Sequence, residues 1–146
     1  MEVCMYKVIL VAVDIAQEEL TSKAIRQAVQ FAKVSGAKLN FIHVLPISSA
    51  IINAYALGYM EIKDRATLKA EDDMQNLLEP IDLPADRLGY TIAFGSPRDE
   101  IVSRAEEINA DIIILGSRSP NITTHLLGST AAGVVRYAKT SVLVVR

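Results

Sequence analysis

The sequence has almost no cysteine, lacks tryptophan, and shows no excess of charge of either sign. Its 146 residues include one cysteine, Cys4, which rules out an internal disulfide and a cysteine-rich zinc site. Lys and Arg number 15 against 17 Asp and Glu, so the net charge is −2. Because proteins that bind nucleic acids or anionic membranes broadly carry a basic excess, we expect neither of these partners.

Long hydrophobic runs are also missing. The apolar stretch from Tyr6 to Val13 is far shorter than the roughly 20 residues of a membrane-spanning helix, and no basic segment precedes it as in a signal peptide. We therefore expect a cytoplasmic protein. Hydrophobic residues make up 51% and charged residues 22%, as in folded globular domains, and the length predicts a single domain over residues 1–146.

Strand patterns and helix patterns alternate along the chain. Continuous aliphatic runs predict buried strands, and apolar residues at helical spacing predict the helices between them. The expected strands are Lys7 to Asp14, Lys38 to Val44, Leu88 to Phe94, Asp111 to Leu115 and Ser141 to Val145. The expected helices are Glu18 to Gly36, Glu61 to Glu79, one that begins with Ser96 as cap and Pro97 as first residue, and Ser129 to Ala138. This alternation predicts an α/β domain with a mostly parallel sheet, while Pro46 to Met60 is either a semi-apolar loop or a short helix.

Polar residues follow two of these strands, at the carboxyl ends where open α/β sheets bind ligands. Asp14 ends the first strand, and Gly116 begins a polar loop that returns through Gly128 to Thr130 into the last helix. Free N–H groups at a helix start, hydroxyl groups and a glycine without Cβ together form a seat for a phosphate group. Arg118 would add a positive charge beside it.

A simpler interpretation of each residue stays open at this point. The Gly-Ser-Thr step can be a helix cap alone, and Asp14 can close the turn after the first strand. Arg118 can be a solvated loop residue, and His43, inside a strand, fits a structural role. Neither a Walker-type phosphate loop nor a Gly-x-Gly-x-x-Gly turn after the first strand occurs, which disfavours Walker-type NTPases and dinucleotide sites.

The chain resembles the universal stress protein family from its first strand to its last. The residues that carry this resemblance are Val11 to Asp14, Gly116 to Arg118, Leu126 to Ser129 and Ser141 to Arg146. Asn121 to Ser129, followed by Val134 to Arg136, resembles the enterobacterial F/G-type branch. The resemblance implies an open parallel sheet of five strands in the order 3-2-1-4-5, with helices on both faces. The resemblance thus implies a Rossmann-like fold of the adenine nucleotide α-hydrolase type.

The resemblance also implies ATP or ADP bound between the ends of strands one and four. Ala12 and Val13 would line the adenine pocket, Val44 would pack on the base, and Asp14 would meet the ribose. The remaining contacts to ribose and phosphates would come from Gly116, Arg118, Ser119, Gly128, Ser129 and Thr130. The family motif has a second glycine where this chain has Ser119, and eight residues rather than nine separate that position from Gly128. Mg²⁺ would arrive with the nucleotide, since no carboxylate cluster has metal-ligand spacing.

The last strand, Ser141 to Val145, would lie at the edge of this sheet. An uncovered apolar edge pairs readily with another copy, and the resemblance likewise implies a homodimer through this strand. The other possibility is an edge covered by the chain's own amino terminus.

We therefore expect a cytoplasmic stress-response protein that binds ATP or ADP as a homodimer. Hydrolysis would be slow or absent, because no residue stands out to activate a water molecule. One alternative is a dimeric interaction module that binds no nucleotide. Another is an adenylate-processing enzyme, but Ala12 to Ala16 lacks the cluster of Ser, Gly and Asp or His that such enzymes carry near the first strand.

Overall fold

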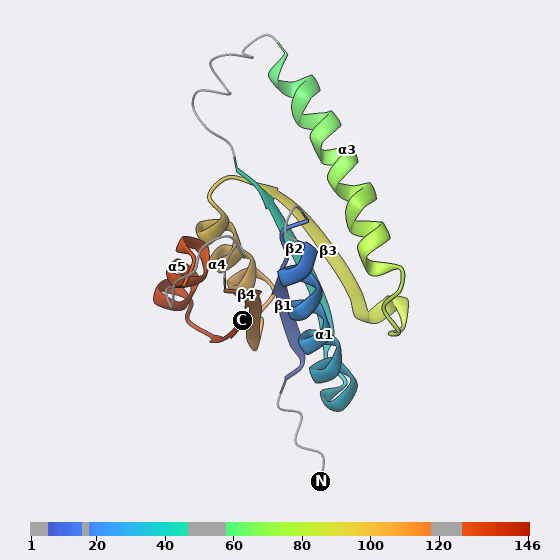
Figure 1. Ribbon diagram of the computed structural model, residues 1–146, viewed down its shortest axis with the longest axis vertical. Coiled ribbons are helices and arrows are strands. Elements are labelled where there is room, and N and C mark those ends of the chain that lie inside the picture. Colours follow the sequence, from blue (N-terminus) through green and yellow to red (C-terminus); the bar gives the residue numbers. More distant parts are fainter. Residues whose placement is uncertain (1–5, 16–17, 47–57, 118–126) are drawn as a thin grey trace.

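Five parallel strands form the centre of the molecule. The computed structural model describes residues 6–15, 18–46, 58–117 and 127–146. The strands are β1 (Val8–Ala12), β2 (Lys38–Leu45), β3 (Leu88–Phe94), β4 (Ile112–Gly116) and β5 (Ser141–Val145). They lie in the order β3-β2-β1-β4-β5, and every neighbouring pair is parallel (Figure 1). The predicted strand order is confirmed.

Helices cover both faces of the sheet, as predicted. They are α1 (Glu18–Ser35), α3 (Tyr59–Leu78), the short 3₁₀ turn η1 (Ala85–Arg87), α4 (Pro97–Glu107) and α5 (Ser129–Tyr137). Ala28 of α1 and Met74 of α3 share one buried cluster with Val11 of β1. Ile101 of α4 and Val134 of α5 belong to a second cluster on the opposite face. Figure 1 shows α3 on one side of the sheet and α4 with α5 on the other.

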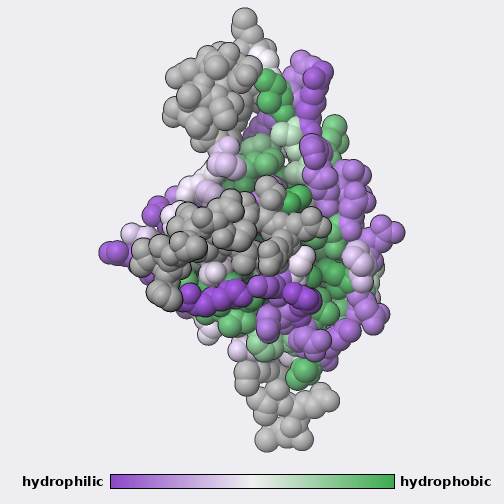
Figure 2. All heavy atoms as spheres, in the orientation of Figure 1, coloured by the Kyte–Doolittle hydropathy of each residue, from purple (hydrophilic) through white to green (hydrophobic). Residues whose placement is uncertain are grey.

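The amphipathic character of α3 is visible on the molecular surface. Figure 2 shows hydrophilic side chains along its outer edge and hydrophobic ones on the side toward the sheet. Ala70 and Met74 are buried there, as the predicted inner stripe requires. Among the described residues, no helix is both long and apolar enough to cross a lipid bilayer.

Most predicted boundaries agree with the structure to within two residues. Ser96 caps α4 as predicted, because its Oγ accepts a hydrogen bond from the N–H of Asp99 at 3.5 Å, and Pro97 is the first helical residue. The segment Pro46 to Met60 differs at its end, because Tyr59 and Met60 already belong to α3. Residues 47–57 lie outside the described part of the chain.

The two strands that carry the predicted site are locked together at their amino ends. A carboxylate oxygen of Asp111 accepts hydrogen bonds from the N–H groups of Lys7 (2.7 Å) and Val8 (2.9 Å), just before β4 and at the start of β1. The pairing then runs in register from Ile9 beside Ile112 to Ala12 beside Leu115. The carboxyl ends of β1 and β4 therefore finish at the same level of the sheet.

Candidate functional site

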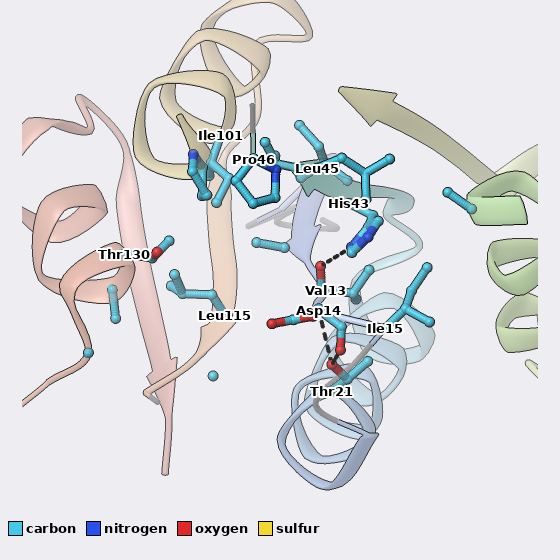
Figure 3. A pocket seen from close by; sticks show the side chains of 18 of the residues that line it. Val13, Asp14, Ile15, Thr21, His43, Leu45, Pro46, Ile101, Leu115 and Thr130 are labelled. Carbon is cyan, nitrogen blue, oxygen red and sulfur yellow. Dashed lines mark hydrogen bonds between the residues drawn. The ribbon is translucent and has the colours of Figure 1, made fainter. Parts of the chain in front are cut away.

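A cavity of about 950 Å³ lies at the carboxyl ends of β1, β2 and β4. This volume is at the upper end of the range of roughly 300–1,000 Å³ that small-molecule sites occupy. The starts of α4 and α5 and the middle of α3 complete its wall, seen from close by in Figure 3. Open parallel sheets bind their ligands at this place. The connections after β1 and β4 leave toward opposite faces of the sheet, and a crevice opens between them.

The turn after β1 is held by a buried hydroxyl group. Thr21 of α1 is 5% exposed, and its Oγ1 donates to the carbonyl oxygen of Asp14 at 2.7 Å. Oγ1 of Thr21 also accepts a hydrogen bond from the N–H of Asp14 at 3.2 Å (Figure 3). Val13 extends the sheet pairing by donating its N–H to the carbonyl of Ile42 at 2.9 Å. The backbone at Asp14 is thus fixed, and this exposed residue lies at the cavity.

The start of α5 faces the same cavity. Gly128 is the residue that precedes the helix; its N–H donates to the carbonyl of Ser117 at 2.7 Å, and its own carbonyl accepts from Ala132 at 2.9 Å. In the described region, no side chain caps this helix. The first N–H groups of a helix have no partner within it, and here Ser129 and Thr130 line the cavity. The geometry is that of an anion seat at a helix N-terminus.

Apolar side chains form most of the remaining wall. Val44 and Leu115 belong to the cluster under α4 and α5, and Ile101 of α4 closes that side. Leu45 and Ala70 contribute to the wall toward α3. A cavity that joins apolar walls to the carboxylate of Asp14 and an anion seat is suited to a ligand with a flat apolar part and a negative end.

The structure brings eight of the ten predicted site residues to this one cavity. They are Ala12, Val13, Asp14, Val44, Gly116, Gly128, Ser129 and Thr130. The other two, Arg118 and Ser119, lie outside the described residues.

Several lining residues were not predicted from the sequence. Helix α3 contributes Lys69 and Asp73, whose Nζ and Oδ2 atoms are 2.8 Å apart. The hydrogen bond to the Asp73 carboxylate raises the pKa of Lys69. The wall therefore presents an ion pair on this side. Among the described residues, no three His, Cys, Asp or Glu side chains are grouped so that they would hold a metal ion.

His43 has the structural contact that its place in a strand suggested, and it also lines the cavity. It is 8% exposed, and its Nδ1 lies 3.2 Å from the carbonyl oxygen of Val13. The ring thus links the end of β2 to the turn that carries Asp14. Nothing in the sequence indicates that a histidine inside an aliphatic strand would also line the cavity.

Comparison with known proteins identifies the family. The model of the universal stress protein family matches residues 5–146. This chain belongs to the universal stress protein family. It is 38% identical over 143 residues to universal stress protein G of Shigella flexneri, covering 97% of this chain and all of that protein. Universal stress protein G of Salmonella typhimurium is 39% identical over the same length, with the same coverage of both chains.

Solved structures of this family share the fold. The structure of the protein MJ0577, a universal stress protein of Methanocaldococcus jannaschii, has a TM-score of 0.81 at 29% identity and covers 97% of this chain and 96% of that one. A universal stress protein solved in complex with cAMP has a TM-score of 0.61 at 28% identity, with 97% of each chain covered. A family member of the same fold therefore binds an adenine nucleotide.

The hydroxyl of Thr21 provides a test of how the turn at Asp14 is held. Replacing Thr21 by Val keeps the shape but removes both hydrogen bonds to Asp14, so we expect the free energy of unfolding to fall by about 1–3 kcal/mol. Urea denaturation measures this loss. Thr21→Ser keeps the hydroxyl and serves as the control with a smaller loss. Equal stability of Thr21→Val and the wild type would contradict this account of the turn.

Proposed function

We propose that this universal stress protein binds ATP or ADP in the cavity at the ends of β1 and β4. The single observation that carries the proposal is the meeting of Asp14, Val44 and the Gly128–Thr130 step in one cavity of suitable size. These residues come from three different elements, and each offers what one part of a nucleotide needs. The complex of a related family member with cAMP supports the same ligand class.

Each part of the nucleotide has a partner in this arrangement. The base packs on the apolar wall of Ala12, Val13 and Val44, and the carboxylate of Asp14 accepts hydrogen bonds from the ribose hydroxyls. The phosphates lie at the start of α5, where N–H groups and the hydroxyls of Ser129 and Thr130 donate to them. Gly116, Arg118 and Ser119 complete the proposed contacts, and Mg²⁺ enters with the nucleotide.

The backbone conformation of Gly128 supports a role in ligand contact. Its φ of −61° and ψ of 158° are open to every residue type, so the turn itself does not require glycine. A glycine at such a position removes a Cβ where a phosphate must approach the backbone closely. Gly128 is therefore the position at which a side chain would most directly oppose the nucleotide.

Gly128→Val tests the nucleotide site. The branched side chain fits the backbone conformation but fills the space of the phosphates, so we expect the Kd for ATP to rise at least about tenfold, a loss of about 1.4 kcal/mol. Isothermal titration calorimetry measures it. Ala132→Val, on an exposed position of the same helix outside the cavity wall, is the control that should bind as the wild type does.

Two outcomes would contradict the nucleotide proposal. One is a wild-type protein that gives neither heat nor a thermal shift with ATP or ADP. The other is Gly128→Val with the affinity of the wild type, which would favour the alternative of an interaction module that binds no nucleotide. Because the chain has no tryptophan and 5 tyrosines, an adenine nucleotide that co-purifies would also stand out in the ultraviolet spectrum.

Hydrolysis is proposed to be slow or absent. Phosphoryl transfer needs a positioned water molecule and a group that activates or orients it. Among the described residues at the seat, Ser117 and Gly128–Thr130 offer amide and hydroxyl groups, and none of them carries a carboxylate or an imidazole. We expect turnover at least about a hundredfold below the roughly 10 per second of a typical enzyme. A phosphate-release assay with saturating ATP checks this, and turnover near 10 per second would identify an ATPase instead.

We further propose a cytoplasmic homodimer joined through β5. This strand lies at the end of the sheet order, and among the described strands it pairs with β4 alone. The carbonyl oxygen of Val145 accepts a hydrogen bond from the N–H of Ser117 at 2.8 Å, so the backbone groups of Val145 face β4. Because the backbone groups of successive strand residues point to opposite sides, the N–H and C=O groups of Val142 and Val144 face the open edge. The possible cover from the chain's start, residues 1–5, lies outside the described part.

Val144→Pro tests the edge. It removes an outward N–H group without breaking a bond to β4, because proline is tolerated on the open side of an edge strand. We expect the variant to stay folded but to elute as a monomer in size-exclusion chromatography with light scattering, where the wild type is a dimer. Val144→Thr keeps the N–H group and should remain dimeric. A folded Val144→Pro dimer, or a wild-type monomer, would contradict pairing through β5.

A further inference from the structure

Gly133 lies in the middle of α5, where glycine is an unfavourable residue. After proline, glycine is the least favourable residue inside a helix, because it loses the most backbone freedom on folding. A neighbouring side chain accounts for it. A Cβ added to Gly133 would lie 2.6 Å from Cδ and 2.9 Å from Cγ of Arg98. Arg98 of α4 therefore crosses α5 more closely than a Cβ at this position would allow.

The side chain of Arg98 is held on both sides of this crossing. Its guanidinium carbon lies 4.9 Å from the ring centre of Tyr137, within the range of a cation–π interaction. Its Nε donates to Oδ1 of Asp99 at 2.8 Å, and this hydrogen bond lowers the pKa of the Asp99 carboxyl. Arg98 is thus joined to its own helix through Asp99 and to α5 through Gly133 and Tyr137.

These contacts connect two helices whose starts line the cavity. Helices α4 and α5 lie side by side on one face of the sheet, and Pro97 and Ser129 at their starts belong to the cavity wall (Figure 1). Ala131 and Val134 hold the buried side of α5, and Arg98 holds the side toward α4. The first N–H groups of a helix point along its axis, so the tilt of α5 determines where they point.

We propose that Arg98 is a positioning residue, which crosses α5 at Gly133 and so directs the N–H groups of Ser129 and Thr130 at the phosphates of the nucleotide. This inference rests on the proposed nucleotide site and adds a residue to it. Arg98 itself lies outside the cavity wall, so it acts through the direction of α5 rather than by touching the ligand.

Two substitutions break the crossing in different ways. Arg98→Ala removes the crossing side chain, whereas Gly133→Ala displaces it by the added Cβ and at the same time makes α5 a better helix. We expect each variant to bind ATP about fivefold more weakly, measured by isothermal titration calorimetry. Because both changes break one contact, the double variant should bind no more weakly than either single variant. Weaker binding by Gly133→Ala would not be explained by a less stable helix.

Two further variants separate positioning from charge. Arg136→Ala removes the same charge from an exposed position of α5 without touching the crossing at Gly133, so it should bind ATP as the wild type does. Arg98→Lys keeps methylene groups against Gly133 and a cation near Tyr137, and its Kd should stay within about twofold of the wild type. Equal weakening by Arg136→Ala and Arg98→Ala would mean that charge alone matters, which would overturn the proposal.

The free protein offers a second measurement that needs no nucleotide. The backbone amide resonances of Ser129 and Thr130 in ¹⁵N-labelled protein report on the start of α5. We expect Arg98→Ala and Gly133→Ala to shift both resonances in the same direction, and Arg136→Ala to leave them in place. Thermal unfolding establishes that each variant is folded, and Gly133→Ala carries the same test if Arg98→Ala fails to fold.

Two results would overturn the role of Arg98 while leaving the nucleotide site intact. They are wild-type affinity for ATP in the folded single variants, and losses that add in the double variant. A wild type that does not bind ATP would instead contradict the proposed nucleotide site. Unchanged resonances of Ser129 and Thr130 in both single variants would contradict positioning by Arg98 whether or not ATP binds.

Discussion

The parallel pairing of β1 with β4 is the constraint on which the rest of the molecule depends. These strands are distant in sequence, yet they lie side by side with Ala12 level with Leu115. The chain leaves β1 into α1 on one face of the sheet and reaches β4 from α4 on the other face. The crevice at their carboxyl ends follows from this change of side, and the hydrogen bonds of Asp111 to Lys7 and Val8 hold the pair in that register.

Around this crevice, a few hydrogen bonds position the residues that line the cavity. Thr21 fixes the turn that carries Asp14, and the Val13 carbonyl orients the ring of His43. Gly128, the residue before α5, donates its N–H to the carbonyl of Ser117 and has no side chain of its own. Each of these contacts involves backbone atoms, so the positions of these groups follow from the path of the chain.

The sequence predicts the sheet well because its strands are continuous aliphatic runs that only a sheet covered on both faces can bury. The cap at Ser96 and the cavity residues from Gly128 to Thr130 were also predicted, since both depend on local chemistry. The Lys69–Asp73 pair and the cavity position of His43 were not predicted. Helical spacing gives the buried face of α3 through Ala70 and Met74, but not which of its turns lies beside the strand ends, because that depends on tertiary packing.

The open edge of β5 has a geometrical consequence for assemblies of this fold. All five strands run in one direction, and the cavity opens at the end toward which they point. If two copies join edge to edge about a two-fold axis, their strands run in opposite directions in one continuous sheet. The two cavities then open on opposite rims, so ligands in them would neither touch nor compete for space. Any communication between them would have to pass through the backbone of the shared sheet.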